Sequence, residues 1–112
     1  MLGFAKKNEG LNIIIVGTGK VGTTLVQQLR KEGHDITVID KSAEKVNSLS
    51  DSFDIMGIVG NGASYTTQKE AGIDNADLII AVTESDELNL LCCTIAKQFS
   101  NCASIARVRT PD

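Results

Sequence analysis

The sequence contains very few aromatic residues: three Phe, one Tyr and no Trp among 112 residues. A hydrophobic core must therefore be built from aliphatic side chains, and a bias toward Ile, Val, Leu and Ala suits strands that are buried on both faces. Apolar residues make up 42% of the chain and charged residues 22%, which is ordinary for a globular domain. A chain of this length has room for one domain.

Cysteine and histidine are also scarce. The three cysteines, Cys92, Cys93 and Cys102, are an odd number without C-x-x-C spacing, and His34 is the only histidine. This pattern argues against both a disulfide framework and a metal site. We interpret Cys92 as a small core hydrophobe because free cysteines are usually buried. Cysteine usage of this kind indicates a reducing, cytoplasmic compartment.

Long apolar runs and an excess of basic residues are absent as well. No run approaches the ~20 apolar residues that span a bilayer, and the start of the chain lacks the apolar stretch of a signal peptide. We expect residues 1–10 to be a flexible lead-in and residues 11–112 to form the domain. The net charge of −3, with acids and bases mixed along the chain, argues against a general nucleic-acid binder.

Short apolar runs alternate with longer helical patterns along the chain. Strands are predicted at residues 12–16, 36–39, 54–59, 78–82 and 103–108. Helices are predicted from about 20 to 33, 42 to 50 with Ser42 as N-cap, 64 to 71, and after Thr83 or Ser85 to 99. The last helix carries one apolar stripe that we expect to face a sheet, formed by Leu88, Leu91, Cys92, Ile95, Ala96 and Phe99.

This alternation of strands and helices predicts an α/β fold with right-handed crossovers and a parallel sheet. The expected architecture is a Rossmann-like, doubly wound sheet with strand order 3-2-1-4-5. In such a sheet ligands bind at the carboxyl ends of strands one and four, where the strand order reverses.

A glycine-rich turn follows the first predicted strand. Gly17-Thr18-Gly19-Lys20-Val21-Gly22 is a G-x-G-x-x-G motif between a buried-type strand and an amphipathic helix. In this motif Gly17 permits the sharp turn, Gly19 lets the backbone approach a pyrophosphate, and Gly22 lets the helix pack closely. The unpaired N–H groups at the helix start then form an anion site. The alternative is a tight turn that binds nothing.

An acidic residue ends the second predicted strand. Asp40 lies eighteen residues beyond Gly22, where a carboxylate can accept hydrogen bonds from the ribose hydroxyls of adenosine. The same charge repels a 2′-phosphate and so favours NAD(H) or an adenine nucleotide over NADP(H). Two alternatives stay open: Asp40 as a cap of the following helix, and an NADP(H) site assisted by the neighbouring Lys41.

Taken together, these motifs resemble the TrkA N-terminal domain family, also called RCK or KTN domains, which regulates potassium uptake systems and potassium channels. The resemblance covers nearly the whole chain from Leu11 onward. The matching segments are residues 13–22, 33–40, 60–63, 71–73, 76–77, 81–87, Asn89 and 105–109. The glycine loop is common to many Rossmann folds, whereas Thr83-Glu84-Ser85-Asp86-Glu87 and Ala106-Arg107-Val108-Arg109 are more particular to this family.

The resemblance implies a cytoplasmic regulatory subunit of a Trk-type potassium transporter, located at the inner face of the membrane through that partner. It implies NAD(H) or ATP/ADP as ligand and a homodimer or higher homo-oligomer. The implied ligand contacts are Gly17, Thr18, Gly19, Lys20, Val21 and Gly22 for phosphates, Asp40 for ribose, Asn61 and Gly62 near the base, and Thr83, Glu84 and Arg107. Family members continue through another helix and strand beyond Thr110-Pro111-Asp112, so we expect a domain that lacks them.

Several alternatives remain at this stage. Thr83 could simply cap the fourth helix, Arg107 could pair with a surface acid, and Lys20 could be a solvated lysine rather than a contact to the terminal phosphate of ATP. A fragment of an NAD-dependent dehydrogenase is the second functional hypothesis. It is disfavoured because His34 is expected in a turn away from the ligand cleft, and hydride transfer usually needs a positioned acid or base. A Rossmann module with an empty cleft is the third.

Overall fold

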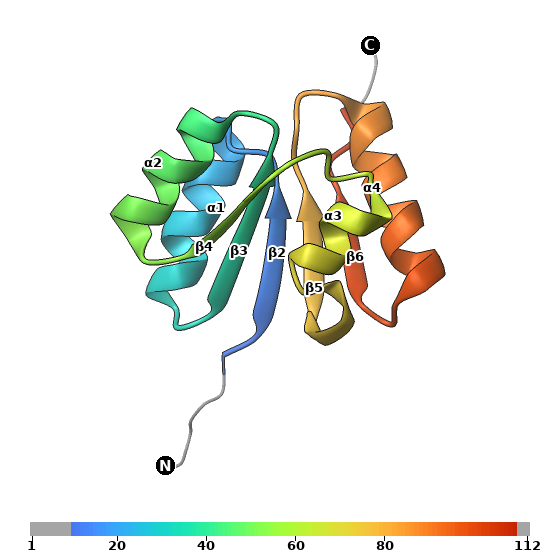
Figure 1. The fold of residues 1–112 in the computed structure, drawn as a ribbon, viewed down its shortest axis with the longest axis horizontal. Helices are drawn as coiled ribbons and strands as arrows, with labels where there is room; N and C mark the ends of the chain where they lie inside the picture. Colours follow the sequence, from blue (N-terminus) through green and yellow to red (C-terminus); the bar gives the residue numbers. More distant parts are fainter. Residues whose placement is uncertain (1–9, 110–112) are drawn as a thin grey trace.

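The computed structural model describes residues 10–109. All but Gly10 of the expected lead-in therefore lies outside the described residues. The described chain forms one five-stranded sheet in the order β4-β3-β2-β5-β6 (Figure 1). The strands are β2 (Asn12–Val16), β3 (Asp35–Asp40), β4 (Met56–Val59), β5 (Leu78–Ala81) and β6 (Ala103–Ala106). All neighbouring strands are parallel, which confirms the predicted fold and its 3-2-1-4-5 order.

Helices cover both faces of this sheet. The helices α1 (Lys20–Lys31) and α2 (Ala43–Phe53) pack on one face, and α3 (Tyr65–Glu70), the 3₁₀ turn η1 (Ile73–Asn75) and α4 (Asp86–Phe99) pack on the other. In Figure 1 the two groups lie on either side of the central strands β2 and β5. Helices or turns connect the five strands in sequence and every pair is parallel, so the carboxyl ends of all five strands lie along one edge of the sheet.

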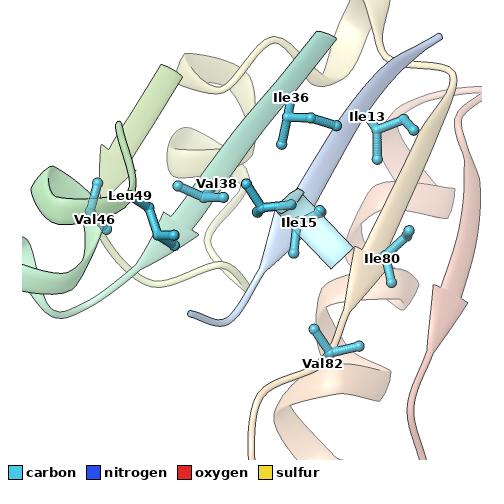
Figure 2. Close-up of a cluster of buried hydrophobic side chains, with 9 residues drawn as sticks. Ile13, Ile15, Ile36, Val38, Val46, Leu49, Ile80 and Val82 are labelled. Atoms are coloured by element: carbon cyan, nitrogen blue, oxygen red, sulfur yellow. The ribbon is translucent and has the colours of Figure 1, made fainter. Parts of the chain in front are cut away.

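The central strand β2 explains why the fold needs no aromatic core. Its continuous run of aliphatic residues sends Ile13 and Ile15 to the α1–α2 face and Ile14 and Val16 to the α3–α4 face. Figure 2 shows the first of these clusters, in which Ile13 and Ile15 lie among side chains from β3, α2 and the β5 region. All four side chains are at most 3% exposed. Burying each one stabilises the fold by about 1.5–3 kcal/mol.

Serine side chains begin three of the helices. Ser42 accepts a hydrogen bond from the N–H of Lys45 at 3.3 Å, which confirms the predicted N-cap of α2. Ser64 caps α3 in the same way, and Ser85 caps α4 by accepting from the N–H of Leu88 at 3.1 Å. Ser85 rather than Thr83 is therefore the cap of α4. Thr83 lies outside the helix and is available for other contacts.

Three predicted strands are shorter in the structure. The third begins at Met56 rather than residue 54 because α2 extends to Phe53 and the next residue, Asp54, has a left-handed φ of +55° that does not fit a strand. The fourth ends at Ala81 rather than residue 82. The fifth ends at Ala106 rather than residue 108. Its neighbour β5 ends at Ala81, the register partner of Ala106, so the ladder has no further partner.

The apolar stripe of α4 is only partly buried. Cys92 and Ala96 are fully buried as expected, but Leu91 and Phe99 remain 49% and 47% exposed. α4 packs on β5 and on β6, which is the edge strand of the described sheet. Within residues 10–109 no helix is long and apolar enough to cross a membrane.

Candidate functional site

The predicted residues surround two adjoining cavities at the carboxyl ends of β2, β3 and β5. The larger cavity, of about 380 Å³, is lined by Gly17, Thr18, Gly19, Lys20, Val21, Asp40, Lys45, Val82, Thr83, Glu84, Arg107 and Arg109. The smaller, of about 100 Å³, is lined by Val16, Ile39, Asp40, Lys41, Gly60, Asn61, Gly62, Thr83 and Leu88. Asp40 and Thr83 line both, so the two cavities form one cleft. Every predicted site residue except Gly22 lines this cleft.

The three glycines of the loop have three different structural roles. Gly17 has a φ of +113°, and its N–H donates to the carbonyl of Ile39 at 2.9 Å, so the chain turns sharply at the end of β2. A Cβ at Gly22 would lie 1.9 Å from the carbonyl oxygen of Gly17, so only glycine allows α1 to pack this closely. A Cβ at Gly19 would meet no atom within 4 Å. Gly19 therefore leaves the backbone open to the larger cavity.

The helix behind this loop lacks the side-chain cap that the other helices have. The N-cap of α1 is Gly19, no side chain accepts a hydrogen bond from its first turn, and that turn contains no acid. The first intrahelical bond is donated by the N–H of Thr23 to the carbonyl of Gly19. The preceding N–H groups and the positive end of the helix dipole thus point toward the cleft, where they favour an anion.

Asp40 connects the end of β3 with the glycine loop. Its Oδ2 accepts hydrogen bonds from the N–H and the hydroxyl of Thr18, both at 2.8 Å, and its Oδ1 accepts one from the N–H of Ser42 at 3.1 Å. Burial by itself raises the pKa of the Asp40 carboxyl, but the hydrogen bonds from Ser42 and Thr18, together with the adjacent backbone N–H of Lys41, outweigh it, so the pKa lies below its ordinary value. The group is a carboxylate at neutral pH.

Thr83 and Arg107 meet on the opposite side of the cleft. The guanidinium Nη2 of Arg107 donates to the carbonyl of Thr83 at 2.6 Å. Arg107 thus contacts a backbone carbonyl at the cleft. Thr83 is held in turn by Asn89, whose Oδ1 accepts from the N–H and the hydroxyl of Thr83 at 2.8 and 2.7 Å.

A second buried amide supports the loop after β4. Gln68 is fully buried, and its Nε2 donates to the carbonyl of Gly62 at 2.8 Å and to that of Cys92 at 3.0 Å. Gly62 packs so tightly that a Cβ there would lie 2.4 Å from a Val16 methyl group. The side chain of Asn61 accepts from the N–H of Ala63 at 2.9 Å and shapes the turn. The wall of the smaller cavity is therefore rigidly supported.

The larger cavity carries more positive than negative side chains. The cations Lys20, Lys45, Arg107 and Arg109 line it together with two acids, Asp40 and Glu84. Arg109 also lies 3.4 Å from the carboxylate of Asp86 and donates to the carbonyl of Glu84. With the start of α1 added, the field in this cavity favours an anionic ligand.

His34 lies at the other end of the sheet. It immediately precedes β3, and its Nδ1 accepts a hydrogen bond from the N–H of Leu11 at 2.9 Å, which confirms the prediction that it points away from the cleft.

A separate cavity of about 460 Å³ lies beside the first residues of β2 and β3, lined in part by Asn12, Arg30 and Asp35. None of the predicted site residues lines it, and it has no glycine loop.

Four polar residues of the cleft and its support were not predicted as site residues, although Asn89 and Arg109 lie in the segments that resemble the TrkA-N family. Lys45 and Arg109 line the larger cavity, while Gln68 and Asn89 lie buried behind it. One signal was available for Asn89, since it precedes Cys92 by three residues and Ala96 by seven and so shares their buried helix face. A polar residue at such a position needs a partner, and the partner is found only in the fold.

Residues 13–112 match the TrkA-N domain family over almost the whole chain. The chain belongs to this family. The match confirms the resemblance on which several of the predicted site residues rest. This TrkA-N domain is 41% identical over 100 residues to the Trk system potassium uptake protein TrkA of Halomonas elongata, covering 88% of the chain but 22% of that protein.

A shorter relative gives a similar picture. The domain is 40% identical over 100 residues to a TrkA homolog of Methanothermobacter thermautotrophicus, covering 89% of the chain and 46% of that protein. The TrkA-N domain thus spans less than half the length of these relatives. Its fold is also that of part of the GsuK channel bound to NAD, with a TM-score of 0.78 at 20% identity over 96% of the chain and 19% of the channel chain.

Proposed function

We propose that this TrkA-N domain binds an adenine nucleotide that carries a diphosphate, and that binding regulates a potassium transport system. The observation that carries the proposal is the uncapped start of α1, which faces the same cavity as the Asp40 carboxylate. One end of the cleft thus suits phosphates, and an acid suited to ribose lies beside it.

The phosphate side of the proposal rests on the backbone. The open position of Gly19 and the N–H groups that begin α1 suit a pyrophosphate, which would approach the backbone more closely than any side chain there permits. The excess of cations around the cavity adds long-range attraction. Thr18, Lys20 and Val21 line the same wall.

The ribose side depends on the hydrogen-bonding capacity left on Asp40. Its Oδ2 already accepts two hydrogen bonds, whereas Oδ1 accepts one. A carboxylate oxygen can accept about two hydrogen bonds, so Oδ1 retains room for a ribose hydroxyl. A 2′-phosphate would meet the negative charge of Asp40, so NAD(H) and ATP or ADP fit better than NADP(H).

The base side is the smaller, mostly apolar part of the cleft. Val16, Ile39 and Leu88 provide its apolar wall, and Asn61 and Gly62 provide its rim. This part suits one face of an adenine ring. NAD(H) and ATP or ADP all contain the adenosine and the diphosphate that the cleft suits. The GsuK channel bound to NAD contains a part with the same fold as this domain.

The regulatory part of the proposal comes from the relatives, which are Trk system potassium uptake proteins. We propose that the domain acts in the cytoplasm, as part of a homodimer or larger assembly attached to a membrane potassium transporter, and that it performs no catalysis of its own. A useful switch needs a coupling of about 1–3 kcal/mol between nucleotide and transporter. The nucleotide must therefore bind one conformation of the assembly more tightly than another.

Calorimetric titration with NAD+, NADH, ATP, ADP and NADPH tests the proposal. We expect binding of at least one adenine nucleotide and weaker binding of NADPH than of NADH. The variant Gly19→Asp should bind none, because its carboxylate would point into the phosphate site. Gln27→Glu adds the same charge at an exposed position of α1 away from the cleft and should bind normally. Undiminished binding by Gly19→Asp would reject the loop as the site.

A further inference from the structure

Asn89 is a fully buried polar side chain in the middle of α4. Its Oδ1 accepts two hydrogen bonds from Thr83, and its Nδ2 donates to the carbonyl of Thr83 at 3.1 Å and to that of Arg107 at 2.9 Å. These four bonds use both donors and both acceptor positions of the amide. All of them go to two residues that line the cleft.

These bonds begin where the sheet ends. The last paired residues of β5 and β6 are Ala81 and Ala106, and only the N–H of Arg107 still donates across, to the carbonyl of Ala81. Beyond this point no strand pairing sets the distance between Thr83 and Arg107. Asn89 connects the main chains of the two residues from the buried side, because one planar amide holds the carbonyls of both.

The same arrangement orients a charged group. The carbonyl of Thr83 accepts from Asn89 and, at 2.6 Å, from the guanidinium of Arg107. Asn89 therefore fixes the carbonyl that in turn holds the guanidinium at the wall of the larger cavity. Packing alone does not explain an amide at this position, because Cys92 and Ala96 on the same face of α4 are also fully buried and fill it with apolar atoms.

We propose that Asn89 is a positioning residue for nucleotide binding, which holds Thr83 and Arg107 in the geometry that the ligand meets. This inference rests on the proposed function and adds a residue that itself lies outside the cleft. Asn89 does not line either cavity, so its effect must pass through the two residues that it holds.

The first test replaces the amide with a side chain of similar size. Asn89→Leu removes all four hydrogen bonds, and we expect the dissociation constant of the best-bound nucleotide to rise about tenfold or more, because Thr83 and Arg107 lose the contacts that fix their geometry. Ile73→Ala is the control, because Ile73 is 1% exposed in η1 and lines neither cavity of the cleft. It should lower stability yet bind the nucleotide normally, with all proteins measured where they are fully folded.

The second test distinguishes positioning from a general loss of packing. Asn89→Asp keeps the shape and the acceptor toward Thr83 but replaces the Nδ2 donors with an oxygen that faces two carbonyls. Burial raises the pKa of such a carboxyl, and its protonated form regains one donor. We therefore expect nucleotide affinity to recover in this variant from about pH 8 to about pH 5.5. The unmodified protein over the same range is the reference for the other groups around the cleft, including Glu84, Asp86, Arg107 and Arg109.

The outcomes separate this inference from the proposed function. If the unmodified protein binds no adenine nucleotide, the proposed function fails, and this inference fails with it. If the unmodified protein binds but Asn89→Leu binds equally well, only the inference is overturned. A loss in Asn89→Leu no larger than that in Ile73→Ala, or an Asn89→Asp variant without recovery at low pH, also counts against a positioning role.

Discussion

The carboxylate of Asp40 accepts hydrogen bonds from both the backbone N–H and the hydroxyl of Thr18, each at 2.8 Å. Thr18 lies in the glycine loop after β2, and Asp40 ends the neighbouring strand β3. With the third bond from Ser42, one side chain joins the loop, the strand and the start of α2. The residue that we propose to bind ribose is thus also part of the fold, so its two roles need separate measurements.

Replacing Asp40 should weaken the fold as well as the site. Asp40→Asn substitutes a donor for one of the acceptor oxygens, so at least one partly buried N–H loses its partner. We expect the free energy of unfolding to fall by about 1–3 kcal/mol, measured by urea denaturation. Asp35→Asn is the matched control, since Asp35 is an exposed acid at the other end of β3. Equal stability of the two variants would contradict this role of Asp40.

The contribution of Asp40 should also depend on pH. Because the hydrogen bonds to Asp40 lower its pKa despite the opposing effect of burial, the folded state binds a proton here less readily than the unfolded state. Its stabilisation is therefore fully present above the unfolded pKa, near pH 4, and is lost as the pH falls through the lowered folded pKa. The stability gap between the unmodified protein and Asp40→Asn should be constant from about pH 7 to 5 and narrow toward pH 3. A gap that widened on acidification would have the wrong sign.

Gly22 should tolerate no side chain. A Cβ there would lie 1.9 Å from the carbonyl oxygen of Gly17, which is backbone and cannot rotate away. We expect Gly22→Ala to cost several kcal/mol, on the order of 2–4, or to prevent folding. Gly19→Ala meets open space at a φ of −75° and should change stability by less than about 1 kcal/mol. Thermal unfolding of the two variants measures the contrast.

The three cysteines should differ in reactivity. Cys92 is fully buried, and burial together with the neighbouring Cys93 raises the pKa of its thiol to about 12. Burial also raises the pKa of Cys93 and Cys102, but both side chains remain partly accessible. A thiol-disulfide reagent at about pH 8 should modify Cys102 and Cys93 in the native protein and Cys92 only after unfolding, because the thiolate is the reactive form. Mass spectrometry of the modified peptides identifies the order.

Lys20 should distinguish ATP from ADP if it contacts a terminal phosphate. Its side chain is exposed at the first position of α1 and lines the larger cavity. We expect Lys20→Ala to raise the dissociation constant for ATP several-fold more than that for ADP. Lys31→Ala removes the same charge at the far end of the helix and should leave both unchanged. Equal losses for ATP and ADP in Lys20→Ala would rule out this contact.

The sequence alone determined the sheet, its strand order and the meeting of the glycine loop with Asp40. These features follow from local information: a continuous aliphatic strand must be central, a parallel sheet needs right-handed crossovers, and the G-x-G-x-x-G spacing sets a turn before a helix. Once the order is known, residues at the carboxyl ends of adjacent strands must lie together. Asp40 and Thr18 do so for this reason.

How the cleft is supported and how much of α4 is covered depend on contacts between elements far apart in the chain. Asn89 holds Arg107, eighteen residues away, and Gln68 holds Cys92, twenty-four residues away. Helical periodicity places Asn89 and Leu91 on particular sides of α4, but it does not say what lies opposite them. A buried amide and a half-exposed leucine are distinguished by the packing of elements far apart in the chain, which no local pattern contains.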